Sequence, residues 1–255
     1  MKSYFPQSRI TRDEITDGLR RLGLGSGDLV HVHSSLRSLG HVVGGAEAVV
    51  DALLEAVAPG GTVMVPTFNH GAAEVFDVRT TPSTNGAITE ALRCRPTAVR
   101  SVHPTHPCAA IGPPARELVE GHLQLCTFDA DSPLGRCGRL GGWVLLLGVG
   151  MQVNTSAHIG ETMANVHCLG FRQLERRVRL PSGEVITAWS DIWRDGPCRI
   201  EWEPLERLMR ERELITDGRV GLAECHLMRC RDVIACTFEL TKTLCPGCPT
   251  QPSCP

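Results

Sequence analysis

Hydrophobic and polar positions follow two alternating periods along the first part of the chain. Short apolar runs, typical of buried strands, occur at residues 28–35, 62–68, 108–112 and 143–150. Segments with helical spacing lie between them, at residues 11–22, 46–58, 84–95 and 113–122. Strands that alternate with helices predict an α/β domain, in which a central mixed sheet is flanked by helices.

The first predicted helix carries clear signals at both ends. Thr11 and Glu14 form a capping-box pattern, in which each side chain satisfies a backbone N–H of the first turn. Leu19 and Leu22 continue one apolar face, and the glycine-rich residues 23–27 then break the helix.

The last third of the chain has a different pattern. A hairpin is expected around residues 181–183, followed by helix, strand and helix over residues 200–214, 220–229 and 231–244. Because no segment is rich enough in Gly, Pro or Ser to mark a linker, we predict one domain over residues 1–244. Residues 245–255 form a Cys/Pro-rich C-terminal tail.

Composition narrows the class of protein. The net charge of −2 gives no basic excess for a nucleic-acid partner. No stretch approaches the roughly 20 apolar residues that span a bilayer, and the N-terminus lacks the apolar centre of a signal peptide. We therefore expect a cytoplasmic protein without membrane contact, and free thiols for most of its 12 cysteines.

A candidate acid–base pair follows the most apolar strand. Residues 154–156 can cap a helix, which places His158 in or near its first turn and Glu161 on the same face. A histidine beside a carboxylate is a plausible general base. A plain surface contact is the alternative that this spacing leaves open.

Two other polar segments follow or precede predicted strands. Ser34 and Ser35 end the strand at residues 28–35, and their hydroxyls suit phosphate or amide recognition, or simply cap the strand. His103 and His106 flank a rigid proline turn, which could line a substrate site, serve structure or contribute to a metal site.

Metal binding has limited support in the sequence. Cys245 and Cys248 form a CxxC zinc half-site, but no second pair with matching spacing accompanies them. We therefore expect flexible thiols in the tail and no bound metal.

The polar and apolar segments together resemble the aminoglycoside 3-N-acetyltransferase family. The matching stretches, in the order and spacing of the family, are HSSLRSLG (33–40), VVGGAEAVVDALLEAV (42–57), GTVMVPTF (61–68), FDVRTTPSTNGAITEALR (76–93), VRSVHPTHPCAAIG (99–112), DSPLG (131–135) and LLLGVGMQVNTSAHIGE (145–161). The likeness is close over residues 14–166 and looser beyond.

This resemblance implies the antibiotic N-acetyltransferase fold, distinct from the GNAT fold, and acetylation of the 3-amino group of a 2-deoxystreptamine aminoglycoside by acetyl-CoA, which confers antibiotic resistance. It implies His158 as the catalytic histidine with Glu161 close by. The residues that it implies along the path of CoA are Ser34, Ser35, Leu36, His103 and Thr105. Departures at residues 107–108 and 151–152 put the antibiotic range in doubt.

The expected reaction is a direct transfer. His158 removes a proton from the amine, and Glu161, Glu201 or Glu203 orients the ring. Thr105 or a backbone N–H stabilises the oxyanion. A covalent route through Cys108 is the competing mechanism.

A polycationic substrate requires acidic groups. The candidates for substrate binding are Asp77, Asp129, Asp131, Glu201 and Glu203. Other interpretations are an acetyltransferase of the same fold acting on a non-aminoglycoside amine, a binding module without chemistry, and a zinc-dependent hydrolase using His103, His106 and His158. The sequence leaves homodimer formation open.

Overall fold

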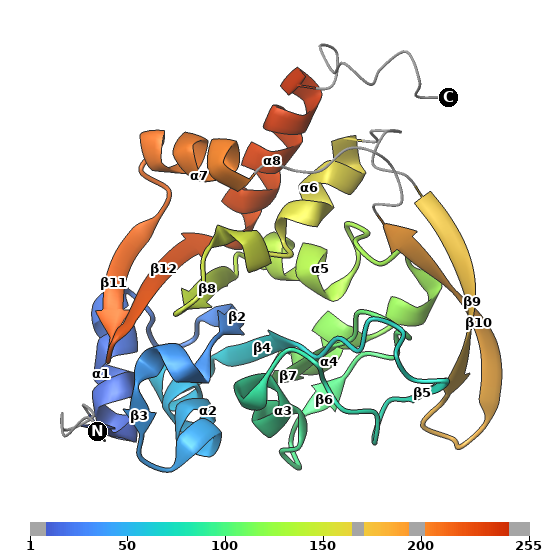
Figure 1. Ribbon diagram of the computed structural model, residues 1–255, viewed down its shortest axis with the longest axis horizontal. Helices are drawn as coiled ribbons and strands as arrows, with labels where there is room; N and C mark the ends of the chain where they lie inside the picture. The colour runs from blue at the N-terminus through green and yellow to red at the C-terminus, as the bar shows by residue number, and fades with distance from the viewer. Residues whose placement is uncertain (1–8, 165–170, 194–201, 245–255) are drawn as a thin grey trace, which may run out of the picture.

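The computed structural model describes residues 9–164, 171–193 and 202–244. Its centre is a seven-stranded mixed sheet with helices on both faces (Figure 1), which confirms the predicted α/β architecture. The strand order is β11-β12-β8-β2-β4-β7-β6. The strands are β2 (Leu29–Ser34), β4 (Thr62–Pro66), β6 (Val99–Arg100), β7 (Cys108–Ile111), β8 (Trp143–Leu147), β11 (Thr216–Val220) and β12 (Ala223–Arg229).

Strand direction creates one polar edge of this sheet. Strands β8, β2 and β4 run parallel to one another, so their carboxyl ends lie at the same edge. Strand β7 is antiparallel to β4, and Cys108 at its start pairs with Pro66 at the end of β4. The turn before β7 therefore lies at this edge too, where ligands of open α/β sheets usually bind.

Two apolar cores lie on opposite faces of the sheet. One core packs under α1 (Arg12–Leu22), α2 (Gly45–Ala56) and α3 (Ala87–Arg93). The other packs under α4 (Ala115–Val119), α5 (Pro133–Arg139), α6 (Ala157–Ala164), α7 (Trp202–Glu211) and α8 (Cys230–Leu244). Because side chains alternate along a strand, Val30 and Val32 enter the first core while His31 and His33 point toward the second.

A smaller three-stranded sheet flanks the central one. It contains β5 (Val75–Asp77), β9 (Phe171–Arg179) and β10 (Val185–Trp193), in the order β10-β9-β5. Strands β9 and β10 form the predicted hairpin, which runs along the right side of the molecule in Figure 1. Phe76, Val178 and Ala188 give this sheet a core of its own.

Short elements complete the fold. Strands β1 (Arg9–Ile10) and β3 (His41–Val42) pair in parallel. Three 3₁₀ turns follow strands or helices: η1 (Leu36–Leu39), η2 (His122–Gln124) and η3 (Met151–Val153).

Several predicted boundaries need correction. The helix predicted over residues 84–95 begins only at Ala87, because Thr84 and Asn85 bind the backbone of Phe68 instead. The helix predicted over 113–122 ends at Val119. The strand predicted over 220–229 is β12, which a turn joins to β11. Residues 245–255 lie outside the described residues.

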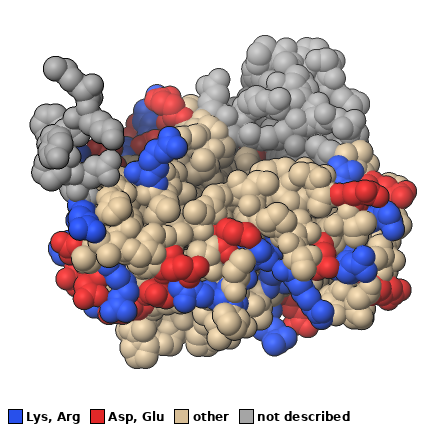
Figure 2. All heavy atoms as spheres, turned by 60° about the horizontal axis from the view of Figure 1, so that its bottom comes forward, with Lys and Arg blue, Asp and Glu red and all other residues tan. Residues whose placement is uncertain are grey.

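The described surface and helices show two further features. Basic and acidic side chains are interspersed on the face drawn in Figure 2. Within the described ranges, no helix is long and apolar enough to cross a membrane.

Candidate active site

The candidate active site centres on an imidazole–carboxylate pair in α6. His158 Nδ1 lies 2.5 Å from Glu161 Oε2, across one helical turn as the spacing predicts. The side chain of Glu161 is 2% exposed and that of His158 is 12% exposed. A buried carboxylate at this distance fixes the orientation of the ring, and it stabilises the ring when the ring is protonated.

A second histidine, His33, lies beside this pair. It occupies the end of β2 and points to the same face of the sheet as α6. Thr155 Oγ1, just before α6, lies 3.4 Å from His33 Nε2. Burial, together with the nearby charge of His158, lowers the pKa of His33 to about 3. His33 is therefore neutral at physiological pH.

Aromatic rings link His158 to His106. The ring of Phe128 lies 4.8 Å from the ring of His158 and 5.3 Å from that of His106, measured between centroids. The ring of Trp202 lies 5.7 Å from His158 on another side. The pair in α6 and the turn before β7 thus share one cluster at the polar edge of the sheet.

Hydroxyl groups hold His106 in place. Its Nδ1 lies 2.8 Å from Thr105 Oγ1, which in turn lies 2.9 Å from Ser190 Oγ in β10. Burial, with contributions from His103 and other nearby imidazoles, lowers the pKa of His106 well below its usual value. His106 is thus a neutral, oriented imidazole near His158.

His103 and Thr105 make hydrogen bonds within the turn before β7. His103 is 1% exposed, and its Nδ1 accepts the backbone N–H groups of His106 at 3.0 Å and Thr105 at 3.3 Å. Its ring stacks on that of His122 at 4.3 Å. Both predicted residues lie at the expected edge, but they shape the turn that presents His106.

The loop after β2 meets the loop after β8. Ser35 caps η1, and Ser38 Oγ donates to the carbonyl of Gly148 at 2.8 Å. Gly148 has a φ of 71°, and an added Cβ there would collide with Ser38. Ser34 Oγ is buried and makes no hydrogen bond within the described part of the chain. The predicted residues Ser34, Ser35 and Leu36 therefore lie together beside the end of β8.

The sequence left His106 open as a substrate-lining, structural or metal-binding residue, and it gave no prediction for Phe128, Ser190 or Ser38. The turn at residues 103–106 could have indicated His106, because a rigid turn before a strand presents its side chains at the edge of the sheet. Ser190 carried no such signal, because it is 85 residues from Thr105 and joins it only through the folded hairpin.

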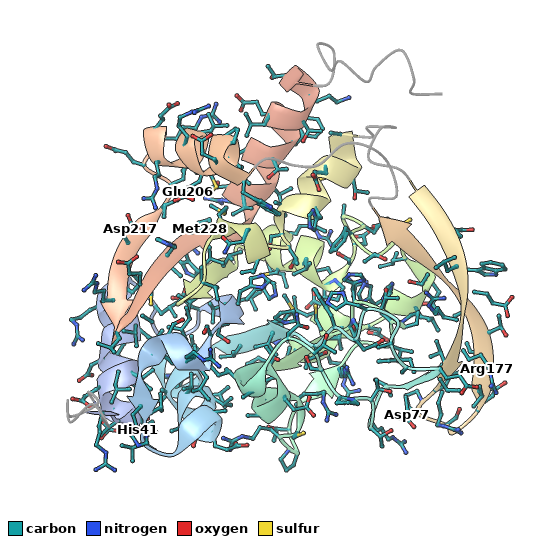
Figure 3. The ribbon with its side chains drawn as sticks, in the orientation of Figure 1. His41, Asp77, Arg177, Glu206, Asp217 and Met228 are labelled. Atoms are coloured by element: carbon teal, nitrogen blue, oxygen red, sulfur yellow. The ribbon has the colours of Figure 1, made fainter. Side chains whose placement is uncertain are left out.

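The predicted acidic residues are spread over the structure. Asp77, which is labelled in Figure 3, accepts the backbone N–H of Arg79 and pairs with Arg179 in the small sheet, so its carboxylate is already engaged. Asp131 pairs with Arg139 and Glu203 with Arg207, both at the surface. Asp129 is partly buried and accepts the N–H of Asp131. Glu201 lies outside the described residues.

The structure gives no support to a nucleophilic Cys108. This thiol is 1% exposed, and burial raises its pKa to about 12. Because the thiolate is the nucleophile, almost none would be present at neutral pH. No three His, Cys, Asp or Glu side chains among those described gather closely enough to hold a metal ion.

Comparisons with known proteins identify the family of the chain. The family model for aminoglycoside 3-N-acetyltransferase matches residues 31–242. Aminoglycoside N(3)-acetyltransferase IV of Salmonella is 33% identical, over 87% of this chain and 84% of the relative.

Solved structures share the fold. A mutant of aminoglycoside acetyltransferase AAC(3)-IVa with one histidine replaced by alanine, in complex with a gentamicin, is 30% identical and superposes with a TM-score of 0.84, over 99% of this chain and 96% of that one. AAC-IIIb in binary complex with CoASH is 22% identical, with a TM-score of 0.84 over 93% and 98% of the two chains. The chain belongs to the aminoglycoside 3-N-acetyltransferase family.

Proposed function

We propose that this enzyme transfers an acetyl group from acetyl-CoA to the 3-amino group of 2-deoxystreptamine aminoglycosides in the cytoplasm, and thereby confers resistance. The observation that carries the proposal is the pairing of His158 with buried Glu161 at the ligand edge of the sheet, in a chain of this family. The catalytic unit is the domain over residues 1–244.

His158 acts as the general base. An ammonium group has no lone pair, so the substrate amine must lose a proton before it attacks. With Nδ1 bound to Glu161, Nε2 accepts this proton, and the carboxylate stabilises the imidazolium that forms. The amine attacks the thioester carbonyl, which gives a tetrahedral oxyanion with a positively charged nitrogen. As the C–S bond breaks, this nitrogen loses its second proton. One of the two protons removed from nitrogen ends on the departing thiolate of CoA, and the other is released to solvent.

The loop after β2 is the part of the site that we assign to acetyl-CoA, the acetyl donor. The hydroxyl of Ser34 is a buried polar group without a partner in the described part of the chain, and such groups favour a polar ligand. Together with Ser35 and Leu36 it lies where β2 and β8 both end. We assign acetyl-CoA to this edge, with no metal in the reaction.

His106 takes over the oxyanion role first expected of Thr105. The Thr105 hydroxyl already contacts His106 and Ser190. If this hydroxyl donates to Nδ1, His106 carries its proton on Nε2 and donates toward the thioester oxygen. A neutral imidazole suits this task because it donates an N–H hydrogen bond while it carries no net charge.

The experiment that tests the function is an acetyl-CoA assay over a panel of aminoglycosides, with thiol release as readout and NMR to locate the acetyl group. We expect acetylation at the 3-amino group. Turnover with other amines, but with no aminoglycoside, would show that the substrate belongs to another class of amines. No thiol release with any amine would overturn the catalytic assignment.

A further inference from the structure

A second cavity lies apart from the candidate active site. It has a volume of about 680 Å³ and is bounded by β6, α4, the segment after β5 and the turn between β9 and β10. Its lining residues do not include His158, Glu161 or His106. Its volume is in the range of small-molecule sites, about 300–1,000 Å³.

Four of the residues that line this cavity are arginines: Arg79, Arg93, Arg100 and Arg116. Glu90 neutralises Arg93 through a contact of 2.6 Å. Glu120 is the one carboxylate among the described residues that line the space. The four arginines therefore carry two positive charges more than the carboxylates of Glu90 and Glu120 balance.

Among the residues that the structure describes, the guanidinium of Arg100 is bound by neutral groups rather than by a carboxylate. Its guanidinium donates to the Thr67 carbonyl at 2.7 Å and to the Thr81 carbonyl at 2.5 Å, both neutral acceptors. Burial, with the nearby charge of Arg93, lowers the pKa of Arg100 to about 10. An anion in the cavity would relieve the repulsion between these cations.

The rest of the lining is apolar or neutral. Val99, Val119 and Leu180 contribute apolar wall. His122 also faces the space, and burial lowers its pKa to about 3, so it adds no charge at neutral pH. A matching ligand carries about two negative charges at one end and an apolar body at the other.

We propose that this cavity binds an organic phosphate monoester with an apolar body. A phosphate monoester carries about −1.5 to −2 charge at pH 7, which matches the two uncompensated guanidinium groups. The planar guanidinium fork binds phosphate oxygens in pairs. Arg79 and Arg116 are exposed and bind the phosphate at the mouth, while the apolar wall receives the body.

The test is calorimetric titration of the full chain with phenyl phosphate. Saturating dephospho-CoA is present throughout, because it has no phosphate monoester and blocks the site assigned to acetyl-CoA. We expect saturable binding of one equivalent that weakens as salt rises. Phenol should show no binding, and inorganic phosphate should bind more weakly than phenyl phosphate.

Matched variants locate the ligand. The double variant Arg79→Gln, Arg116→Gln should bind phenyl phosphate about tenfold more weakly or worse. Arg21→Gln, at an exposed arginine of α1, should bind like the wild type. All variants should keep wild-type acetyl transfer, which also shows that they fold.

Three results would overturn the proposal. One is the absence of saturable binding to the wild type. Another is equal affinity in the double variant and the wild type. The third is binding of phenyl phosphate that occurs without dephospho-CoA but is lost in its presence, which would place it in the catalytic site. None of these results depends on which amine the enzyme acetylates.

Discussion

At the scale of single residues, neighbours decide what each histidine can do. His158 has a carboxylate within 2.5 Å, whereas His33 and His122 are buried with the pKa of each lowered to about 3. His226 has a carboxylate equally close, but that of Asp217 is exposed, whereas the Glu161 carboxylate beside His158 is buried. The i, i+3 spacing predicted this pair from the sequence, but the neutral histidines around it required the fold.

Replacing the proposed base tests its role directly. His158→Ala should lower kcat by about 10²–10⁴-fold, the usual worth of a general base. The affinity for CoA, measured by calorimetry, should stay unchanged because the donor loop is elsewhere. Glu161→Gln keeps the shape of the partner but removes its charge, so kcat should fall less than in His158→Ala. Turnover near the wild-type rate in His158→Ala would exclude the ring as base.

The proposed oxyanion donor has a separate test. His106→Phe keeps a ring against Phe128 but removes the donor, so kcat should fall about 10²–10³-fold with little change in KM. Thr105→Val should cause part of this loss, since it frees the ring of His106 to rotate. Ser182→Ala, at the exposed hairpin turn, is the matched control. An unchanged kcat in His106→Phe would leave the oxyanion to backbone N–H groups.

At the scale of elements, long periodic segments were predictable and short ones were not. Strands β2, β4 and β8 and helices α1, α2 and α8 carry enough apolar positions to show a period. Strand β6 has two residues and β5 three, fewer than a pattern needs, and their partners in the sheets fix them. Helix α5 contains two glycines, and Ser132 at its start is its main local signal.

The capping box of α1 allows a stability prediction. Thr11→Ala removes the acceptor for the Glu14 N–H and the hydroxyl that meets the Glu14 carboxylate. The free energy of unfolding should fall by about 1 kcal/mol in urea denaturation, with kcat unchanged. Thr80→Ala, at another exposed threonine, should change it by less than about 0.5 kcal/mol. Equal losses in the two variants would contradict a capping role.

At the scale of the whole molecule, buried imidazoles make stability depend on pH. Burial lowers the pKa values of His31, His33, His103, His106 and His122. These rings titrate near 6.5 in the unfolded chain, so below that pH the unfolded state binds more protons than the folded state. The free energy of unfolding therefore falls as pH drops below about 6.5, and for His33 and His122 it keeps falling to about pH 3.

The expected loss is on the order of 2 kcal/mol at pH 5 for each of His33 and His122. Urea denaturation at pH 8, 6.5 and 5 measures it. His31→Leu should flatten the pH dependence, because His31 is fully buried and neither ring nitrogen has a partner within the described chain. A free energy of unfolding that stays constant from pH 8 to pH 5 would contradict this account.

The hydroxyl pair between Thr105 and Ser190 has a consequence for how such enzymes diversify. The β9–β10 hairpin has its own small core, yet it touches the histidine turn through this pair. A graft of another hairpin should therefore keep His106 in its present orientation only when a hydroxyl returns to position 190. Evolution can then vary the rest of the hairpin while this one position stays constrained.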